Sequence, residues 1–172
     1  MIDKEDLVVA FSGKRDICYD DRITIHQTVC SLSTSLDIGI ARFGGARGVD
    51  TVALHEAHKY VAKKALFEIV VPSKLEDQPG EAVEVIRGVM SDKRRRTILL
   101  EMGHPKYNHQ RYQARNIRIL MGAIHGSPGR RADLLVAFWD REPYGGTWNT
   151  LCCAMDNNIP VFSVRMVGNP ID

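Results

Sequence analysis

Short, unbroken apolar runs recur along this chain and alternate with segments whose apolar residues return every three or four positions. The clearest runs cover residues 7–11, 66–71 and 132–139. A continuous apolar run is typical of a parallel strand that is covered on both faces. The periodicity between the runs is typical of amphipathic helices. The alternation therefore predicts an α/β fold, with a mainly parallel sheet and helices on both faces.

The same patterns place the elements along the chain. We expect strands at residues 7–11, 40–43, 66–71, 97–100, 132–139 and 160–164, and helices at residues 20–36, 49–64, 81–89, 110–124 and 147–156. Residues 73–80 are polar and contain Pro79, which predicts a loop. A chain of 172 residues can bury one substantial core, so we expect a single domain over residues 1–172.

The composition excludes several classes of protein. With 44% hydrophobic and 26% charged residues, the chain is typical of a globular protein. No apolar run approaches membrane-spanning length and the N-terminus is charged, so we expect a cytoplasmic protein without a membrane partner. The four cysteines form no CxxC pair and have no His-rich companion pattern, so we expect no metal and no disulfide; they are Cys18, Cys30, Cys152 and Cys153.

The charge pattern bears on nucleic-acid binding. The formal net charge is only +2, which does not favour a nucleic acid as a partner. Residues 92–96 contain four consecutive cations, but no aromatic side chains are interleaved with them. We therefore expect a solvated connection there and no nucleic-acid partner. The opposing hypothesis, a nucleic-acid module, would use Arg94, Arg95 and Arg96 together with Arg130 and Arg131.

A glycine-rich turn follows the second expected strand. Three glycines fall within residues 43–50, where a strand would pass into a helix. Glycine permits positive φ and a close approach of the backbone to a bound group. Free amides and the helix dipole would then hold an anion, and Arg47 would add a charge and a planar fork of donors. The alternative is that these glycines only permit a tight turn.

A second glycine turn, residues 140–147, follows the strand expected at residues 132–139. Right-handed crossovers place every strand-to-helix loop at one edge of a parallel sheet. The two glycine turns should therefore be neighbours, although about 100 residues separate them. Ligands of open α/β sheets bind at this edge, beyond the carboxyl ends of the strands.

The order of motifs resembles the SLOG superfamily. That group includes the LOG cytokinin-activating phosphoribohydrolases, molybdenum-cofactor carriers, the Rossmann-like domain of DNA-processing protein A and the YpsA-like proteins. The resemblance covers about residues 7–164, and the YpsA-like branch looks most similar, because its members pair an Arg-Asn helix with a Gly-Gly-Thr turn. The motifs that carry it are Ser12-Gly13-Lys14-Arg15, the turn from Gly44 to Asp50, Arg115-Asn116, the Ala132 to Phe138 strand and Gly145-Gly146-Thr147.

The resemblance implies a modified Rossmann-like three-layer sandwich that binds a nucleotide or nucleotide-derived ligand. The two turns would hold its phosphate and ribose, with Thr147 donating to phosphate and Arg115 adding charge. Alternatives stay open: Arg115 pairs with a carboxylate, Asn116 caps a turn and Trp148 belongs to the core. The implied ligand-binding residues are Ser12, Gly13, Lys14, Arg15, Gly44, Gly45, Ala46, Arg47, Gly48, Asp50, Arg115, Asn116, Gly145, Gly146, Thr147 and Trp148.

Catalysis has weaker support. The phosphoribohydrolases carry a glutamate at the position that corresponds to Thr150, and a threonine cannot replace its carboxylate. Asp140 and Glu142, at the expected edge, are weak substitutes for it. We therefore expect a nucleotide-binding sensor, carrier or weak enzyme that requires no cofactor and accepts ADP-ribose-like ligands. The alternative is hydrolysis of a nucleotide N-glycosidic bond. A homo-oligomer, either a dimer or a tetramer, is the assembly that the resemblance suggests.

Overall fold

The computed structural model describes residues 6–103, 110–122, 129–140 and 142–166, and strands and helices alternate through them. The strands are β1 (Leu7–Gly13), β2 (Ile38–Phe43), β3 (Leu66–Val71), β4 (Thr97–Glu101), β5 (Leu134–Trp139) and β6 (Val161–Arg165). The helices are α1 (Tyr19–Ser35), α2 (Val49–Tyr60), α3 (Gly80–Ser91), α4 (Gln110–Met121) and α5 (Gly145–Asp156), and a short 3-10 turn, η1, covers Leu75–Asp77.

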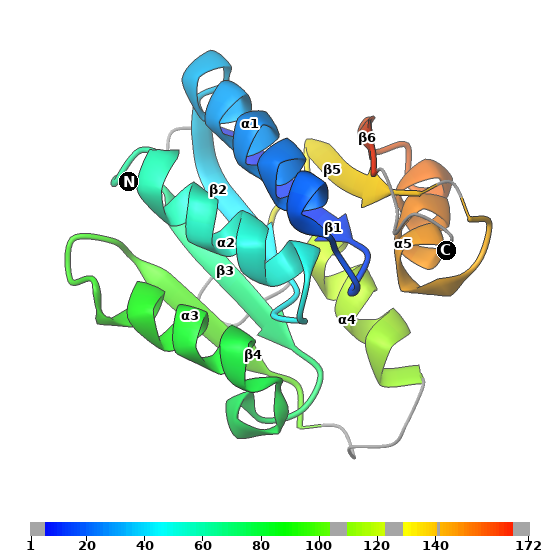
Figure 1. The fold of residues 1–172 in the computed structure, drawn as a ribbon. Coiled ribbons are helices and arrows are strands. Elements are labelled where there is room, and N and C mark those ends of the chain that lie inside the picture. Colours follow the sequence, from blue (N-terminus) through cyan, green and yellow to red (C-terminus); the bar gives the residue numbers. More distant parts are fainter. Residues whose placement is uncertain (1–5, 104–109, 123–128, 141, 167–172) are drawn as a thin grey trace.

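The strands form one parallel sheet in the order β4-β3-β2-β1-β5-β6. Figure 1 shows α1, α2 and α3 side by side in front of the sheet, with α4 and α5 behind it. Contacts join α1 to α2, α2 to α3 and α4 to α5, which fits these two helical layers. The predicted α/β sandwich of three layers is therefore confirmed.

Burial of the strands on both faces explains their apolar runs. All six residues of β3 are buried, including Glu68. On the side of α1 to α3, the rings of Phe11, Phe43 and Phe67 pack in a row, with centroids 5.1 and 5.4 Å apart. A second apolar cluster, which includes Ile119 and Leu135, lies between the sheet and the other two helices. Among the described residues, no helix combines the length and apolar character needed to span a bilayer.

Two expectations about the chain between these elements need correction. The helix expected at residues 49–64 ends at Tyr60, and the expected loop at residues 73–80 contains η1. The connection at residues 92–96 is not simply solvated, because Arg95 is only 5% exposed. Its guanidinium donates to the carbonyl oxygens of Val61 and Ala62, at 2.7 and 3.0 Å, and lies over the Phe67 ring. One cation of the run therefore serves the fold.

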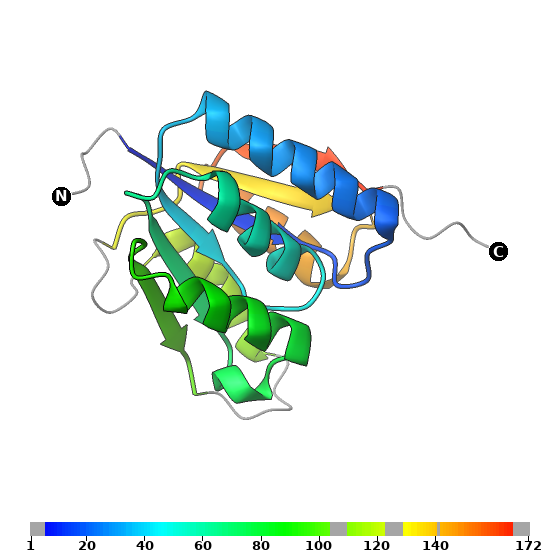
Figure 2. The ribbon, with the colours of Figure 1, turned by 60° about the vertical axis from the view of Figure 1, so that its left-hand side comes forward.

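The strand order reverses between β1 and β5, and that reversal locates the edge at which a ligand would bind. Chain connections run outward from β1 to β4 on one side, and then from β5 to β6 on the other. In Figure 2 the arrows of the strands point toward one edge, where the loops after β1 and β2 lie. Open α/β sheets bind ligands in the crevice beyond the carboxyl ends of the strands at such a reversal.

Candidate functional site

Arg115 and Asn116, adjacent residues of α4, connect the two glycine turns. Arg115 Nη1 donates to the carbonyl oxygen of Gly44, at 2.9 Å, in the first turn. Asn116 Nδ2 donates to the carbonyl oxygen of Gly146, at 3.2 Å, in the second. Arg115 Nε and Nη2 both donate to Asn116 Oδ1, at 3.1 and 2.8 Å. The turns therefore meet at one edge of the sheet, as the alternation of strands and helices predicts.

Arg115 also forms an ion pair with Asp50, from Nη1 to Oδ2 at 3.0 Å, and both side chains are nearly inaccessible to solvent. The backbone amide of Ala46 also donates to Asp50 Oδ2, at 3.3 Å. Burial raises the pKa of Asp50, and the neighbouring charge of Arg115 opposes that rise. The ion pair that the sequence left as an alternative for Arg115 is present, and a ligand role for Arg115 stays a prediction.

The glycines of the first turn are buried against protein atoms. A Cβ at Gly48, where φ is +82°, would lie 2.3 Å from the carbonyl oxygen of Arg15. A Cβ at Gly45 would lie 2.6 Å from the side chain of Val71, and one at Gly44 would meet Arg115. Packing therefore accounts for all three glycines, and phosphate binding by this turn, with Ala46 and Arg47, stays a prediction.

The second turn is open. Gly145 and Gly146 are exposed, and a Cβ at either would meet no atom within 4 Å. These glycines begin α5, and Tyr144, which directly precedes the helix, makes no side-chain capping bond. The first turn of α5 also contains no acidic residue, whereas that of α2 contains Asp50. The amide end of α5 is therefore open to an anion from solvent.

Thr147 and Trp148 follow the second turn and are half-buried. Trp148 stacks on Trp139 of β5, with ring centroids 5.5 Å apart, and packs against the apolar cluster beneath α5. This is the core position that the sequence left as an alternative for Trp148. Ligand contacts of Thr147 and Trp148 stay predictions.

The loop after β1 lies between the two turns. Lys14 Nζ lies 3.8 Å from Asp21 and 3.8 Å from Asp140, so this cation faces the loops on both sides of the strand reversal. Ser12 Oγ donates to Thr150 Oγ1 at 3.5 Å, and a Cβ at Gly13 would overlap Val49. Ser12 and Gly13 thus pack within the protein, and Lys14 stands at the crevice with its charge offset by two carboxylates.

A shallow pocket of about 200 Å³ opens beside the first turn. Arg22 pairs with Glu81 at 3.3 Å, and Arg47 pairs with Asp16 at 2.7 Å, both at exposed positions. The sequence analysis missed Arg22 and Glu81, because they lie on helices outside any motif. The lining consists of Arg15, Asp16, Ile17, Arg22, Arg47, Gly48 and Glu81.

Tyr112 of α4 is a further residue that the motifs did not indicate. The guanidinium carbons of Arg15 and Arg111 each lie 4.6 Å from the centroid of its ring. Arg111 and Arg15 lower the pKa of the Tyr112 hydroxyl through hydrogen bonds and charge, against the raising effect of burial. An aromatic ring with two arginines therefore stands at the same edge as the glycine turns.

Neither Asp140 nor Glu142 makes contacts that mark its carboxylate as a catalytic acid or base. Asp140 faces Lys14, and its Oδ1 accepts a 3.4 Å bond from the amide of Glu142. Glu142 is exposed, and its carbonyl oxygen accepts from the indole of Trp139 at 2.9 Å. Thr150 is fully buried and donates to the Gly146 carbonyl oxygen at 2.9 Å. Within the described ranges, no group of His, Cys, Asp and Glu could hold a metal ion.

Comparison with known proteins adds structural neighbours only, since no family model and no curated protein matches the chain. DNA processing protein A from Helicobacter pylori has a TM-score of 0.65 and 18% identity, over 98% of this chain and 69% of that protein. DNA processing protein A from Streptococcus pneumoniae has a TM-score of 0.68 and 18% identity, over 97% of this chain and 52% of that protein. This chain thus spans about half the length of the streptococcal protein.

The molybdenum cofactor binding protein of Rippkaea orientalis is a neighbour of another kind, with a TM-score of 0.55 and 17% identity over 94% of this chain and 77% of that one. The Helicobacter protein binds single-stranded DNA. The expectation that a nucleic acid is not a partner is contradicted, because a protein of the same fold binds single-stranded DNA. These identities show the fold alone, and the YpsA-like branch has no specific support.

Both kinds of neighbour have a Rossmann-like sheet of this type and belong to the superfamily that the motifs suggested. The chain therefore shares its fold, a parallel Rossmann-like sheet between two helical layers, with both kinds of neighbour.

Proposed function

We propose that the protein binds a phosphate-bearing small molecule, a nucleotide or a nucleotide derivative, at the carboxyl edge of the sheet. The phosphate would lie against the amides at the start of α5, between the loops that follow β1 and β5. Binding, as a sensor or carrier, is the role that we assign to the site. Hydrolysis of an N-glycosidic bond is the alternative, and it would depend on Asp140 or Glu142.

The observation that carries the proposal is the exposed start of α5. Gly145 and Gly146 leave open space above the first helical amides, and neither a capping side chain nor an acidic residue occupies it. Unpaired amides and the positive end of a helix dipole favour an anion, most of all a phosphate. The starts of α1 and α2 at this edge differ, since Asp21 accepts from the Cys18 amide at α1 and Asp50 accepts from the Ala46 amide at α2.

Two further features bear on the same position. Lys14 stands beside it, and to donate to a ligand oxygen its ammonium would have to turn away from Asp21 and Asp140, each 3.8 Å distant. The contact of Asn116 with the Gly146 carbonyl oxygen fixes the second turn relative to the first. A preorganised turn loses less conformational entropy when a ligand binds. The neighbours that bind molybdenum cofactor support a ligand of this general kind.

Replacing Gly146 by aspartate tests the proposal. An acidic side chain in the first turn of a helix interacts favourably with the dipole, so the fold should be as stable as before. The same carboxylate would repel a phosphate at contact distance and fill the open space. We expect affinity to fall roughly tenfold or more. Isothermal titration with AMP, ADP-ribose, NAD and inorganic phosphate measures this change.

Gly88→Asp is the matched control. Gly88 is an exposed glycine of α3, and a Cβ placed there would meet no atom within 4 Å, so this variant adds the same charge to another helix. We expect Gly88→Asp to leave the affinity unchanged. If the unaltered protein binds none of the four probes, or if both variants bind equally, the proposed site is wrong.

A second candidate function is binding of single-stranded DNA at the same edge. The observation that favours it is the Tyr112 ring with two guanidiniums, those of Arg15 and Arg111, each 4.6 Å from its centroid; a stacked base would replace one of them. Single strands bind through cations that follow the backbone and aromatic rings on which bases stack. Arg22 and Arg47, which line the adjacent pocket, would extend the cationic track. The Helicobacter neighbour, which binds single-stranded DNA, makes this candidate worth testing.

Tyr112→Leu should weaken single-strand binding if the second candidate is right. Loss of one stacked base corresponds to about 1 to 3 kcal/mol, or roughly 5- to 150-fold in affinity. Fluorescence anisotropy of a labelled oligonucleotide measures the change. Phe162→Leu, at a half-exposed aromatic residue of β6, is the control and should have no effect. Equal affinities for the two variants and the unaltered protein would argue against stacking on Tyr112.

A further inference from the structure

Positive charge is concentrated at the opposite edge of the sheet, in the last residues of α2 with the loop that follows it and in the loop before β4. Residues 58–64 and 92–96 together contain seven Lys and Arg residues and one acidic residue, a net charge of +6, whereas the whole chain carries +2. The remainder of the chain therefore carries −4. Such asymmetry creates a local field that the net charge conceals.

The two loops lie side by side because the strands that they precede are neighbours. Residues 61–65 lead into β3 and residues 92–96 lead into β4, and these strands pair from Phe67 with Thr97 onward. Both loops are at the amino ends of the strands, whereas the glycine turns follow the carboxyl ends. The charge is thus remote from the ligand site proposed above.

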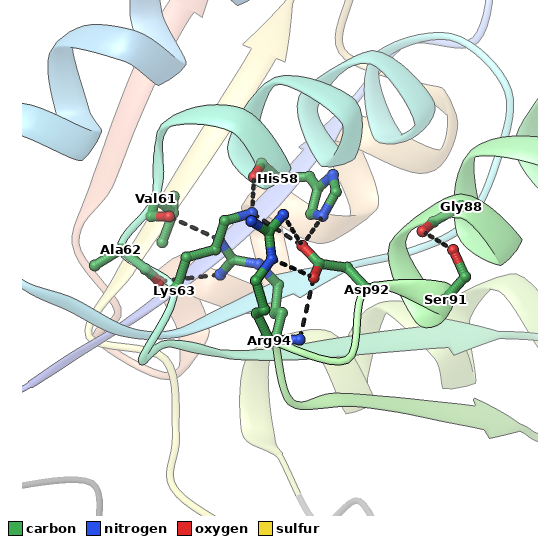
Figure 3. A network of polar contacts seen from close by, with 9 residues as sticks. His58, Val61, Ala62, Lys63, Gly88, Ser91, Asp92 and Arg94 are labelled. Carbon is green, nitrogen blue, oxygen red and sulfur yellow. Dashed lines mark hydrogen bonds and ion pairs between the residues drawn. The ribbon is translucent and has the colours of Figure 1, made fainter.

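Internal contacts bind the two loops into one surface. Figure 3 shows the side chains of His58, Lys63 and Arg94 converging on Asp92. His58 Nε2 lies 3.0 Å and Lys63 Nζ 3.1 Å from Asp92 Oδ2, and Arg94 Nε donates to Oδ1 at 3.0 Å. The buried Arg95 completes the connection through its bonds to the carbonyl oxygens of residues 61 and 62. The surface is therefore held in place before any partner arrives.

Asp92 organises the cations around it and offsets only one of their charges. The hydrogen bonds from Arg94 and Lys63 hold the pKa of its carboxyl well below the usual range, so it stays charged at neutral pH. Burial lowers the pKa of His58, which keeps that ring neutral. Arg94 remains 78% exposed and Lys63 42% exposed.

The outer lysines of the segments are neutralised by acidic neighbours. Lys59 pairs with Glu56 at 3.0 Å, and Lys64 pairs with Asp37 at 3.3 Å. The part of the surface that keeps its excess charge is therefore smaller than the two loops. We name it the amino-edge basic patch, and it comprises Lys63, Lys93, Arg94 and Arg96, all of them exposed or half-exposed.

We propose that the amino-edge basic patch is a docking surface for the sugar-phosphate backbone of a nucleic acid, read without regard to sequence. Exposed Arg and Lys side chains that neutralise phosphates supply this kind of binding through release of counterions. The planar fork of Arg96 matches phosphate oxygens, whereas Arg94, whose Nε and Nη2 donate to Asp92, contributes its charge. Protein interfaces instead rely on apolar and aromatic anchors, which the patch lacks. The nearby ring of Tyr60 already packs edge-on against His26.

Neutralising Lys93 and Arg96 together, as Lys93→Gln/Arg96→Gln, tests the patch without touching Asp92 or Arg95. Anisotropy titrations would use a labelled single strand and a labelled duplex of about 20 nucleotides, in salt from about 50 to 200 mM. We expect the affinity to fall on the order of tenfold, and the salt slope for the duplex to decrease by about 2. Binding of inorganic phosphate and ADP-ribose at the other edge should not change.

Arg87→Gln/Arg165→Gln is the control, since it removes the same charge at two exposed arginines outside the patch. The proposal is overturned if the unaltered protein binds neither oligonucleotide, or if the control loses as much affinity as the patch variant. It is also overturned if only Tyr112→Leu weakens binding, since DNA would then lie at the carboxyl edge. Sedimentation with phosphatidylserine vesicles, without oligonucleotide binding, would assign the patch to a membrane surface instead.

Discussion

Replacing Arg115 by methionine is expected to destabilise the protein by about 3 to 5 kcal/mol, because it leaves the buried carboxylate of Asp50 without its cation. The same change removes the hydrogen bonds from the guanidinium to the Gly44 carbonyl oxygen and to Asn116. Urea denaturation at neutral pH would measure the loss. Once unpaired, Asp50 should become more basic, since burial already raises its pKa and Arg115 opposes that rise.

The control for this prediction is Gln113→Met, which introduces the same side chain at an exposed position of the same helix. It should cost less than about 1 kcal/mol, as most surface substitutions do. Asp50→Asn/Arg115→Met should recover part of the stability, because the uncompensated charge is then gone. A loss below about 1 kcal/mol for Arg115→Met would mean that the ion pair does not hold the two turns together.

The effect of Arg115→Met on ligand affinity can be measured separately from its effect on folding stability. At a temperature where Arg115→Met is still folded, the second turn keeps its glycines but loses the neighbour that orients Asn116. We therefore expect weaker phosphate binding at the start of α5, by a smaller factor than Gly146→Asp produces. If Arg115 were itself a phosphate ligand, its loss would reduce affinity at least as much as the aspartate does.

The arrangement of strands and helices could be predicted because burial on two faces leaves a strong signal in each strand. The run at Leu66–Val71 coincides with β3, residue for residue. Even Glu68 did not obscure it, since five apolar residues surround that one charge. Ends of helices were predicted less well, and α2 stops at Tyr60 although the helical pattern continues toward Lys64. The backbone of Val61 is already extended, and the spacing of apolar residues does not encode that change.

The candidate site was harder to predict, because its contacts come from distant parts of the chain. The partners of Arg115 lie 65 and 71 residues away in sequence, so no local pattern shows that its donors are occupied. The same holds for Arg95, whose carbonyl acceptors lie 33 and 34 residues away. Two glycine turns with similar sequences also differ in environment, one packed against Val71 and the other open. Composition alone does not separate these cases.

The second large effect concerns Arg42 and Glu68, which face each other on β2 and β3 and are both fully buried. Arg42 Nε donates to Glu68 Oε2, and Nη1 donates to the carbonyl oxygen of Ile119 near the end of α4, at 3.5 Å. Among the described residues, Arg42 Nη2 and Glu68 Oε1 have no hydrogen-bond partner. Arg42→Met alone should destabilise the protein by about 3 to 5 kcal/mol, since Glu68 would be a lone buried charge.

Replacing both charges should reverse this loss. Taking a carboxylate and a guanidinium out of water costs several kcal/mol for each ion, and incomplete hydrogen bonding leaves part of that cost unrecovered. Arg42→Met/Glu68→Leu fills a similar volume with apolar atoms beside Leu66, Val70 and Ile119 of the same cluster. We expect it to be at least as stable as the unaltered protein, and up to about 4 kcal/mol more stable, in urea denaturation. If the double variant were no more stable than Arg42→Met, the pair would have to stabilise the fold through the end of α4, and Arg42 would then rank with Arg115 among the residues that position that helix.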